Sequence, residues 1–149
     1  MPPPGSDRGT RCRPGADFPR DRNPLFHLGA RPVLADVDSR GQLDLTDAAR
    51  RITDRTKAVV AVHLWGLPED MDALVSFADE HGLMLLEDGS HAHGATWNGQ
   101  RTGTFGAASA FSLNGPRPLS AGEGGRVMRT VQLLRYLSDA PLRLPGGGR

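Results

Sequence analysis

Lysine is almost absent from this chain. Of the 18 basic residues among its 149 residues, Lys57 is the only lysine, and all the others are arginines. Any reaction that needs a lysine side chain must therefore use Lys57 or proceed without one. Cys12 is the only cysteine, so no disulfide can form within the chain. A reducing compartment is the default for such a sequence, and we expect the protein to be cytoplasmic.

Long apolar runs and a strong net charge are missing as well. No apolar run is long enough to cross a bilayer, so we expect no membrane association. The net charge of +1 creates no general attraction to nucleic acid. The N-terminal residues contain no apolar stretch of the kind that a secretory signal needs. A hydrophobic fraction of 38% and a charged fraction of 23% fit a soluble globular protein.

Composition divides the chain into three zones. Residues 1–24 contain half of the 12 prolines and show no strand or helix periodicity, so we expect a disordered or loosely attached segment. Residues 25–139 carry the periodic segments and form the predicted folded domain. Residues 140–149 are rich in glycine and proline, and we expect a flexible tail.

Strand-like and helix-like segments alternate within the folded zone. Strand-like apolar runs cover 32–38, 57–65, 83–88, 107–113 and 125–130. Helical spacing is found over 44–52, 68–82 and 131–137. Asp44 or Thr46 could cap the first of these helices, Pro68 stands in the first turn of the second, and Gly82 ends it. This alternation predicts an α/β fold with a mostly parallel sheet flanked by helices.

Ligands bind outside the carboxyl ends of the strands in such sheets, so residues that follow a strand are candidates for a site. Asp88 ends the run 83–88. It could cap a loop or helix start, or it could face the ring nitrogen of a pyridine cofactor and keep that nitrogen protonated. Ser112 lies near the end of the run 107–113, and its hydroxyl could hold a phosphate oxygen together with the backbone N–H groups that follow.

Histidines near these strand ends allow a different interpretation. His91 and His93 could form a metal-binding pair, which Asp88 or His63 would complete. The spacing of a third ligand is not diagnostic, and solvated loop histidines are the alternative. His63, near the end of the run 57–65, could reach the same cleft or could pack in the core.

Four segments, taken together, resemble one known family: "ARPVLADVD", "TKAVVAVHLWGLPEDMDAL", "HGLMLLEDGSHAHGA" and "FSLNGPRPLSAGEGG". Their order and spacing are similar to those of the DegT/StrS family of pyridoxal-phosphate-dependent (PLP-dependent) sugar aminotransferases. The resemblance implies a partial large domain of the fold-type-I transferases and a small-molecule substrate such as a keto-sugar. It also implies association as a homodimer or pairing with an intact relative. The match fades toward both ends, so we expect only part of the family's fold.

The resemblance also implies roles for individual residues. Asp88 matches the aspartate that pairs with the pyridine nitrogen, His91 matches a position that contacts the ring oxygen, and Ser112 matches a serine that binds the cofactor phosphate. Arg117 falls where the family has the lysine that forms a Schiff base with PLP.

Arginine cannot take over the chemistry of that lysine. A guanidinium stays protonated and forms no comparable imine. Lys57 is at the start of its strand, so we expect it at the opposite end of the sheet from Asp88 and Ser112. We therefore expect a catalytically impaired aminotransferase in which Arg117 occupies the catalytic position. The alternatives are a non-catalytic pseudoenzyme that binds cofactor or a partner chain and, more distantly, a metal-binding module through His91 and His93.

Overall fold

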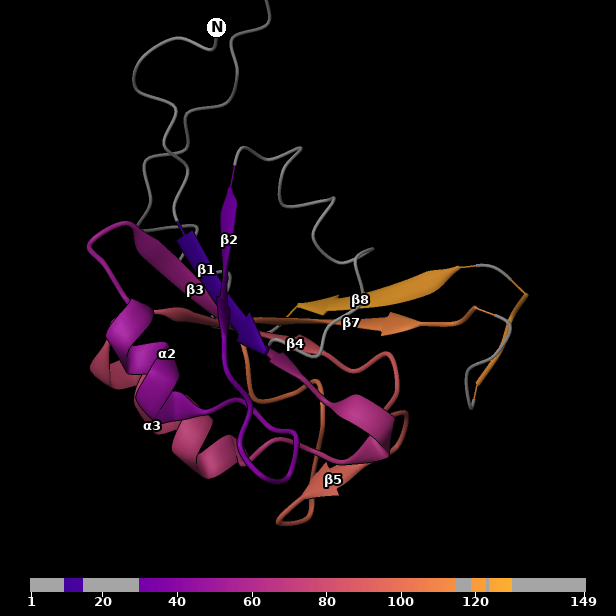
Figure 1. The fold of residues 1–149 in the computed structure, drawn as a ribbon. Coiled ribbons are helices and arrows are strands. Elements are labelled where there is room, and N and C mark those ends of the chain that lie inside the picture. The colour runs from indigo at the N-terminus through magenta and orange to yellow at the C-terminus, as the bar shows by residue number, and fades with distance from the viewer. Residues whose placement is uncertain (1–9, 15–29, 115–118, 123, 130–149) are drawn as a thin grey trace, which may run out of the picture.

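A six-stranded sheet with the order β2-β1-β3-β4-β7-β8 forms the centre of the structure, a computed structural model that describes residues 10–14, 30–114, 119–122 and 124–129 (Figure 1). The strands are β1 Thr10–Pro14, β2 Arg31–Ala35, β3 Thr56–Val62, β4 Met84–Asp88, β7 Ala108–Ser112 and β8 Gly125–Arg129. Neighbouring strands from β2 to β7 are parallel, and β8 runs antiparallel beside β7. The prediction of an α/β fold with a mostly parallel sheet is confirmed.

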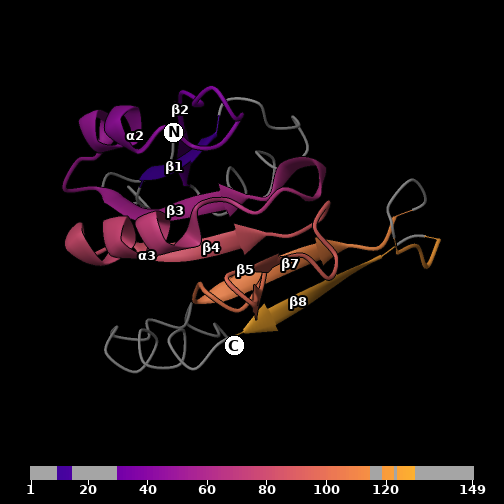
Figure 2. The same ribbon diagram turned by 90° about the horizontal axis from the view of Figure 1, so that it is seen from below.

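The helices α2 (Leu45–Arg51) and α3 (Met71–Glu80) lie on the same face of this sheet (Figure 2). Asp44 caps α2, because its carboxylate accepts hydrogen bonds from the N–H groups of Thr46 and Asp47 at 2.8 Å and 3.1 Å. Of the two predicted caps, Asp44 is therefore the correct one. No helix in the described part of the chain is long and apolar enough to cross a membrane.

The helix α3 begins later than the sequence predicts. Asp70 is its cap, with Oδ1 accepting a hydrogen bond from the N–H group of Ala73 at 3.1 Å. Pro68 lies before the helix rather than in its first turn, and its carbonyl accepts a hydrogen bond from Nε2 of Gln42 at 2.5 Å. At the other end, Gly82 has a φ of +62°, in agreement with its predicted role as the residue that ends the helix.

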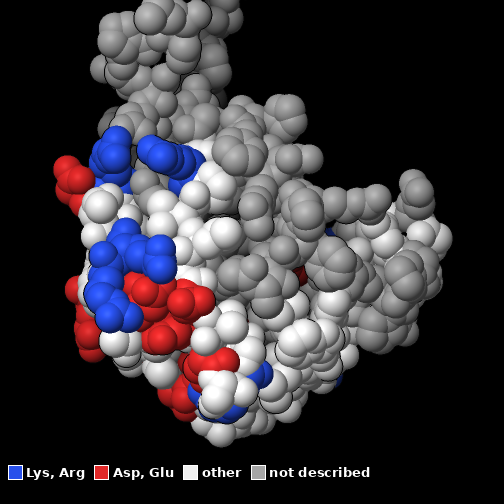
Figure 3. Space-filling model, viewed as in Figure 1, with Lys and Arg blue, Asp and Glu red and all other residues white. Residues whose placement is uncertain are grey.

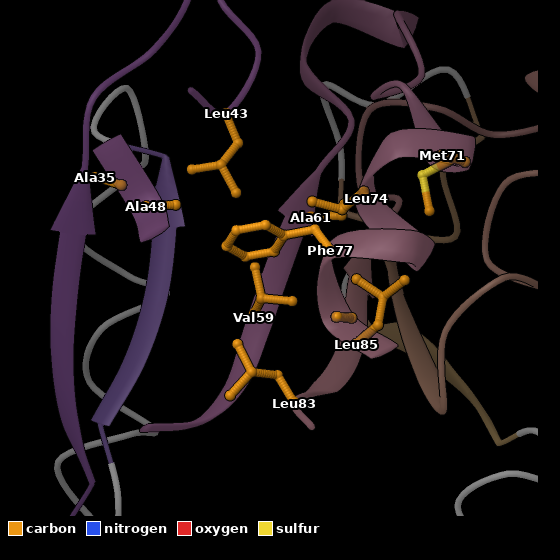
Figure 4. Close-up of a cluster of buried hydrophobic side chains, with 11 residues drawn as sticks. Ala35, Leu43, Ala48, Val59, Ala61, Met71, Leu74, Phe77, Leu83 and Leu85 are labelled. Carbon is orange, nitrogen blue, oxygen red and sulfur yellow. The ribbon is translucent and has the colours of Figure 1, made fainter. Parts of the chain in front are cut away.

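The hydrophobic core lies between these two helices and the sheet. Val59 of β3 and Leu74 of α3 are at most 1% exposed. Figure 4 shows the ring of Phe77 reaching from α3 across β3, between Val59 and Leu43. Full burial of one such side chain contributes about 2 kcal/mol, so apolar packing holds both helices against the sheet.

A strand inside the first 24 residues was not predicted. We expected no regular structure there, yet Thr10–Pro14 form β1, which pairs in parallel with β2 on one side and β3 on the other. The other residues of that segment lie outside the described residues, as do the segment 140–149 and the predicted helix over 131–137. The division of the chain after residues 24 and 139 therefore stays a prediction.

The end of β3 and a small hairpin also differ from the sequence-based expectation. The strand ends at Val62, and Leu64–Gly66 form a 3₁₀ turn in place of the predicted strand end. The unpredicted hairpin joins β5 (Thr96–Trp97) to β6 (Gln100–Arg101). The residues between them, asparagine and glycine, both have positive φ, as a tight two-residue hairpin turn requires.

Candidate functional site

Asp88 and Ser112 lie at the carboxyl ends of two adjacent parallel strands. In the register of β4 and β7, Asp88 is paired with Ala110, and Ser112 lies two residues further along β7. Because side chains alternate between the faces of a sheet, Asp88 and Ser112 point to the same face. Strand spacing and rise put their Cα atoms about 8 Å apart. Both side chains are half-buried, so they could contact one small ligand.

The Asp88 carboxylate has one local hydrogen bond. Its Oδ1 accepts from the N–H group of Ser90 at 2.9 Å, so Asp88 caps the turn after β4 with this oxygen. Within the described residues, Oδ2 makes no hydrogen bond. His91 is half-buried in the same turn. The Ser112 hydroxyl accepts a hydrogen bond from the N–H group of Asn114 at 3.3 Å and could still donate its own hydrogen.

Glu87 forms a buried centre on the opposite face of β4, and the sequence-based reasoning did not single it out. Its side chain is fully buried. Oε1 accepts hydrogen bonds from the N–H groups of Phe105 and Gly106 at 2.8 Å and 2.6 Å, and Oε2 accepts one from Gly103 at 2.6 Å. Burial alone raises the pKa of Glu87, but hydrogen bonds from His63, Gly106 and Gly103 outweigh it and lower the pKa below its ordinary value. Glu87 therefore fixes the loop that leads into β7.

His63 packs in the core and does not reach the face of Asp88. Its ring is fully buried, with Nε2 3.2 Å from Oε2 of Glu87. Nδ1 accepts a hydrogen bond from the N–H group of Glu69 at 3.1 Å. This bond assigns the proton of the neutral ring to Nε2, which donates it to Glu87. Of the two interpretations of His63, the core histidine is the correct one.

The proposed metal pair receives no support from the described residues. No group of three or more His, Cys, Asp or Glu side chains that could hold a metal ion is found among them. The ring of His93 packs against that of Phe111, with centroids 5.4 Å apart. Both ring nitrogens of His93 are buried and have no hydrogen-bond partner among the described residues, so this ring is not a solvated loop histidine.

Of the two basic residues that matter for PLP chemistry, the structure describes only Lys57, and Lys57 does not lie beside Asp88. Lys57 is exposed near the start of β3, and its Nζ donates to the carbonyl of Asp54 at 3.0 Å. Since Val62 is the residue of β3 that pairs with Asp88, Lys57 lies about 16 Å away along the strand. Arg117 lies outside the described residues, so its proposed role rests on the sequence.

Glu69 is a second buried carboxyl that the sequence-based reasoning missed. It is 3% exposed, and the N–H group of Leu43 lies 3.3 Å and 3.1 Å from its two oxygens. Burial raises the pKa of Glu69 from 4.5 to about 7. The folded chain therefore holds a proton that the unfolded chain releases near its ordinary pKa, and the free energy of unfolding falls as the pH rises between these two values.

We expect Glu69→Gln to remove this pH dependence, because glutamine cannot ionise. The variant should gain up to about 3 kcal/mol of stability relative to the parent as the pH rises from about 5 to about 8. Urea unfolding at both pH values measures this difference, and the exposed Glu80 provides a control as Glu80→Gln. Equal pH dependence in parent and Glu69→Gln would show that Glu69 ionises normally in the folded chain.

The model of one protein family matches residues 14–134, and its description is "DegT/DnrJ/EryC1/StrS aminotransferase family". The GDP-perosamine synthase of Vibrio cholerae is 39% identical over 127 residues, which cover 85% of this chain and 34% of that protein. The solved structure of DesI in the presence of its TDP-sugar product is 39% identical, with a TM-score of 0.80, and the match covers 95% of this chain and 37% of that one.

A third similar protein is the E coli GDP-4-keto-6-deoxy-D-mannose-3-dehydratase, solved with bound hydrated PLP. It is 28% identical with a TM-score of 0.76, and the match covers 83% of this chain and 32% of that chain. The chain thus spans about a third of the length of the relatives it matches. With most of its sequence matched by one family model and its fold shared with these structures, the chain belongs to the DegT/DnrJ/EryC1/StrS aminotransferase family.

Proposed function

We propose that this chain holds PLP without a covalent bond and does not carry out amino transfer by itself. The observation that carries the proposal is the placement of Asp88 and Ser112 on one face of two adjacent strands, combined with Arg117 at the position of the family's lysine. Non-covalent binding needs only the first of these features. Amino transfer would also need the lysine.

The donor and acceptor groups present fit the cofactor. Asp88 offers a half-buried carboxylate oxygen with no hydrogen bond among the described residues, and a protonated ring nitrogen would donate to it. The Ser112 hydroxyl would donate to a phosphate oxygen, and His91 would contact the oxygen on the ring. When bound, PLP supplies a protonated ring that stabilises negative charge on a substrate carbon.

The residue at position 117 decides what the chain can do with a bound cofactor. A lysine amine loses its proton and can act as nucleophile and base. The Arg117 guanidinium keeps its proton and its charge at any working pH. It would provide a cation for the phosphate or the substrate, and it would neither attack the aldehyde nor move a proton.

The similar proteins suggest a substrate class and a partner chain for this protein. GDP-perosamine synthase and the DesI complex with a TDP-sugar product both concern sugar compounds, so a keto-sugar is the substrate class we propose for the site. We further propose that the site is completed by a second chain, either another copy or an intact relative, and that the protein works in the cytoplasm.

The proposed binding mode is tested by removing the charge of Asp88. We expect Asp88→Asn to weaken PLP binding about tenfold or more, because a charge-assisted hydrogen bond to the ring nitrogen is lost. Equilibrium dialysis of the 149-residue chain against PLP measures the affinity. Asp79 is an exposed aspartate of α3, and Asp79→Asn should leave the affinity unchanged. Equal affinities for parent and Asp88→Asn would refute the role of Asp88.

A further inference from the structure

A groove of about 180 Å³ lies between the second half of α3 and the starts of β4 and β7. We call it the amino-end groove. Its apolar lining includes Val75, Ala78, Leu83, Leu85, Phe105 and Ala107. Val75 and Phe105 are half-buried, so each leaves apolar surface for a partner. Asp88 and Ser112 lie at the other end of β4 and β7, so the groove is separate from the cofactor site.

The chain leaves the described sheet beside this groove. Arg129, the last residue of β8, pairs with Ala108, so their Cα atoms are about 5 Å apart. Ala107 lines the groove and donates its N–H group to the carbonyl of Leu85 at 2.8 Å. In Figure 2 the arrowhead of β8 lies at the end of the sheet where β7 begins. The residues that follow Arg129 therefore start within about 10 Å of the groove.

The predicted helix over 131–137 follows Arg129 almost directly, and it lies outside the described residues. At 100° per residue, its three leucines would fall within an arc of about 100°, with the polar residues on the other side. This leucine stripe consists of Leu133, Leu134 and Leu137. An isolated helix of two turns is not stable in water, so the segment needs an apolar surface to pack against.

Charge also favours this segment as the occupant of the groove. The last turn of α3 contains Asp79 and Glu80 and no basic residue, although the C-terminal end of a helix favours a positive charge. Asp79 lines the groove. Figure 3 shows acidic side chains gathered over the side of the molecule where α2 and α3 lie. Arg135 of the segment would bring a cation to this end of α3.

We propose that residues 131–137 dock as a helix into the amino-end groove of their own chain, with the leucine stripe against Val75 and Phe105. The docked helix covers Leu83 and Leu85, which belong to the core cluster. Docking thus extends the hydrophobic core at the end of the sheet where β8 finishes. It requires neither PLP nor a second chain, so it does not rest on the proposed function.

Amide hydrogen exchange of the 149-residue chain tests the proposal. We expect the amides of residues 135–137, which donate hydrogen bonds within the docked helix, to exchange at least about tenfold more slowly than in a synthetic peptide of the same sequence. Exchange as fast as in the peptide would overturn the proposal. Protection that disappears when the protein is diluted would assign the groove to a second copy, and this result would overturn it as well.

Two variants show whether the protection comes from this groove. Val75→Glu puts a charge into the groove, and Leu134→Gln removes an apolar side chain from the stripe while keeping a good helix former. The protection of residues 135–137 should be lost in both. Ser76→Glu adds the same charge at an exposed position of α3 and should keep the protection. Should Val75→Glu fail to fold, Leu134→Gln alone decides, and protection retained in Leu134→Gln contradicts the docking.

Discussion

Replacing Glu87 with glutamine should lower the free energy of unfolding by about 3 kcal/mol or more. The Glu87 carboxylate is fully buried and accepts hydrogen bonds from three backbone N–H groups and from the ring of His63. A glutamine amide has one acceptor oxygen, and its NH₂ group would face N–H donors. The variant therefore breaks bonds and leaves buried donors without partners, which costs more than the loss of a surface interaction.

Urea unfolding of parent and Glu87→Gln at about pH 7 measures this loss. Glu80→Gln makes the same chemical change at an exposed position of α3 and should change stability by less than about 0.5 kcal/mol. The lowered pKa of Glu87 adds a second signature. The stability that its ionised carboxylate contributes is fully present above the ordinary pKa of glutamate. It is lost as the pH falls from that value through the lowered pKa of the folded chain. A Glu87→Gln variant as stable as the parent would show that this buried centre does not hold the fold.

The second large effect concerns Arg117. We expect Arg117→Lys to convert non-covalent PLP binding into covalent attachment, because lysine brings a primary amine to the position where the family forms its bond to the cofactor. Borohydride reduction followed by mass spectrometry should then find the cofactor mass on residue 117. Arg101→Lys places a new lysine on the exposed strand β6 and serves as the control, with no attachment expected.

The outcome of Arg117→Lys separates the two halves of the proposed function. Attachment at residue 117 supports both the alignment of Arg117 with the family's lysine and the position of the cofactor above Asp88 and Ser112. Binding without attachment would mean that residue 117 lies elsewhere, while the cofactor site itself stands. Absence of binding in both chains would count against the cofactor site.

Sequence patterns were sufficient to predict the structure of a segment where one property of that segment determined it. The apolar run in 57–65 predicted a strand buried on both faces, and β3 has that burial pattern over most of its length. The capping role of Asp44 and the helix end at Gly82 followed from the chemistry of single residues. Asp88 and Ser112 could be placed at one edge of the sheet because both lie at or near the ends of strand-like runs.

Interactions between distant segments were the part that the sequence could not reveal. Thr10–Pro14 contain two arginines and a proline and show no alternation, so nothing local predicted a strand between β2 and β3. The partners of Glu87 lie 16 to 24 residues away along the chain. One local signal existed, since Glu87 and Asp88 are consecutive acids at the end of a strand and must point to opposite faces.

The most direct test of the central claim uses the parent chain alone. PLP is bound at saturation, the sample is treated with borohydride, and all peptides are examined for the cofactor mass. A second portion is dialysed without reduction. We expect measurable binding that dialysis reverses, with no cofactor mass on any peptide, including the one that carries Lys57. Cofactor attached to Lys57 would contradict the claim, and so would a chain that binds no PLP.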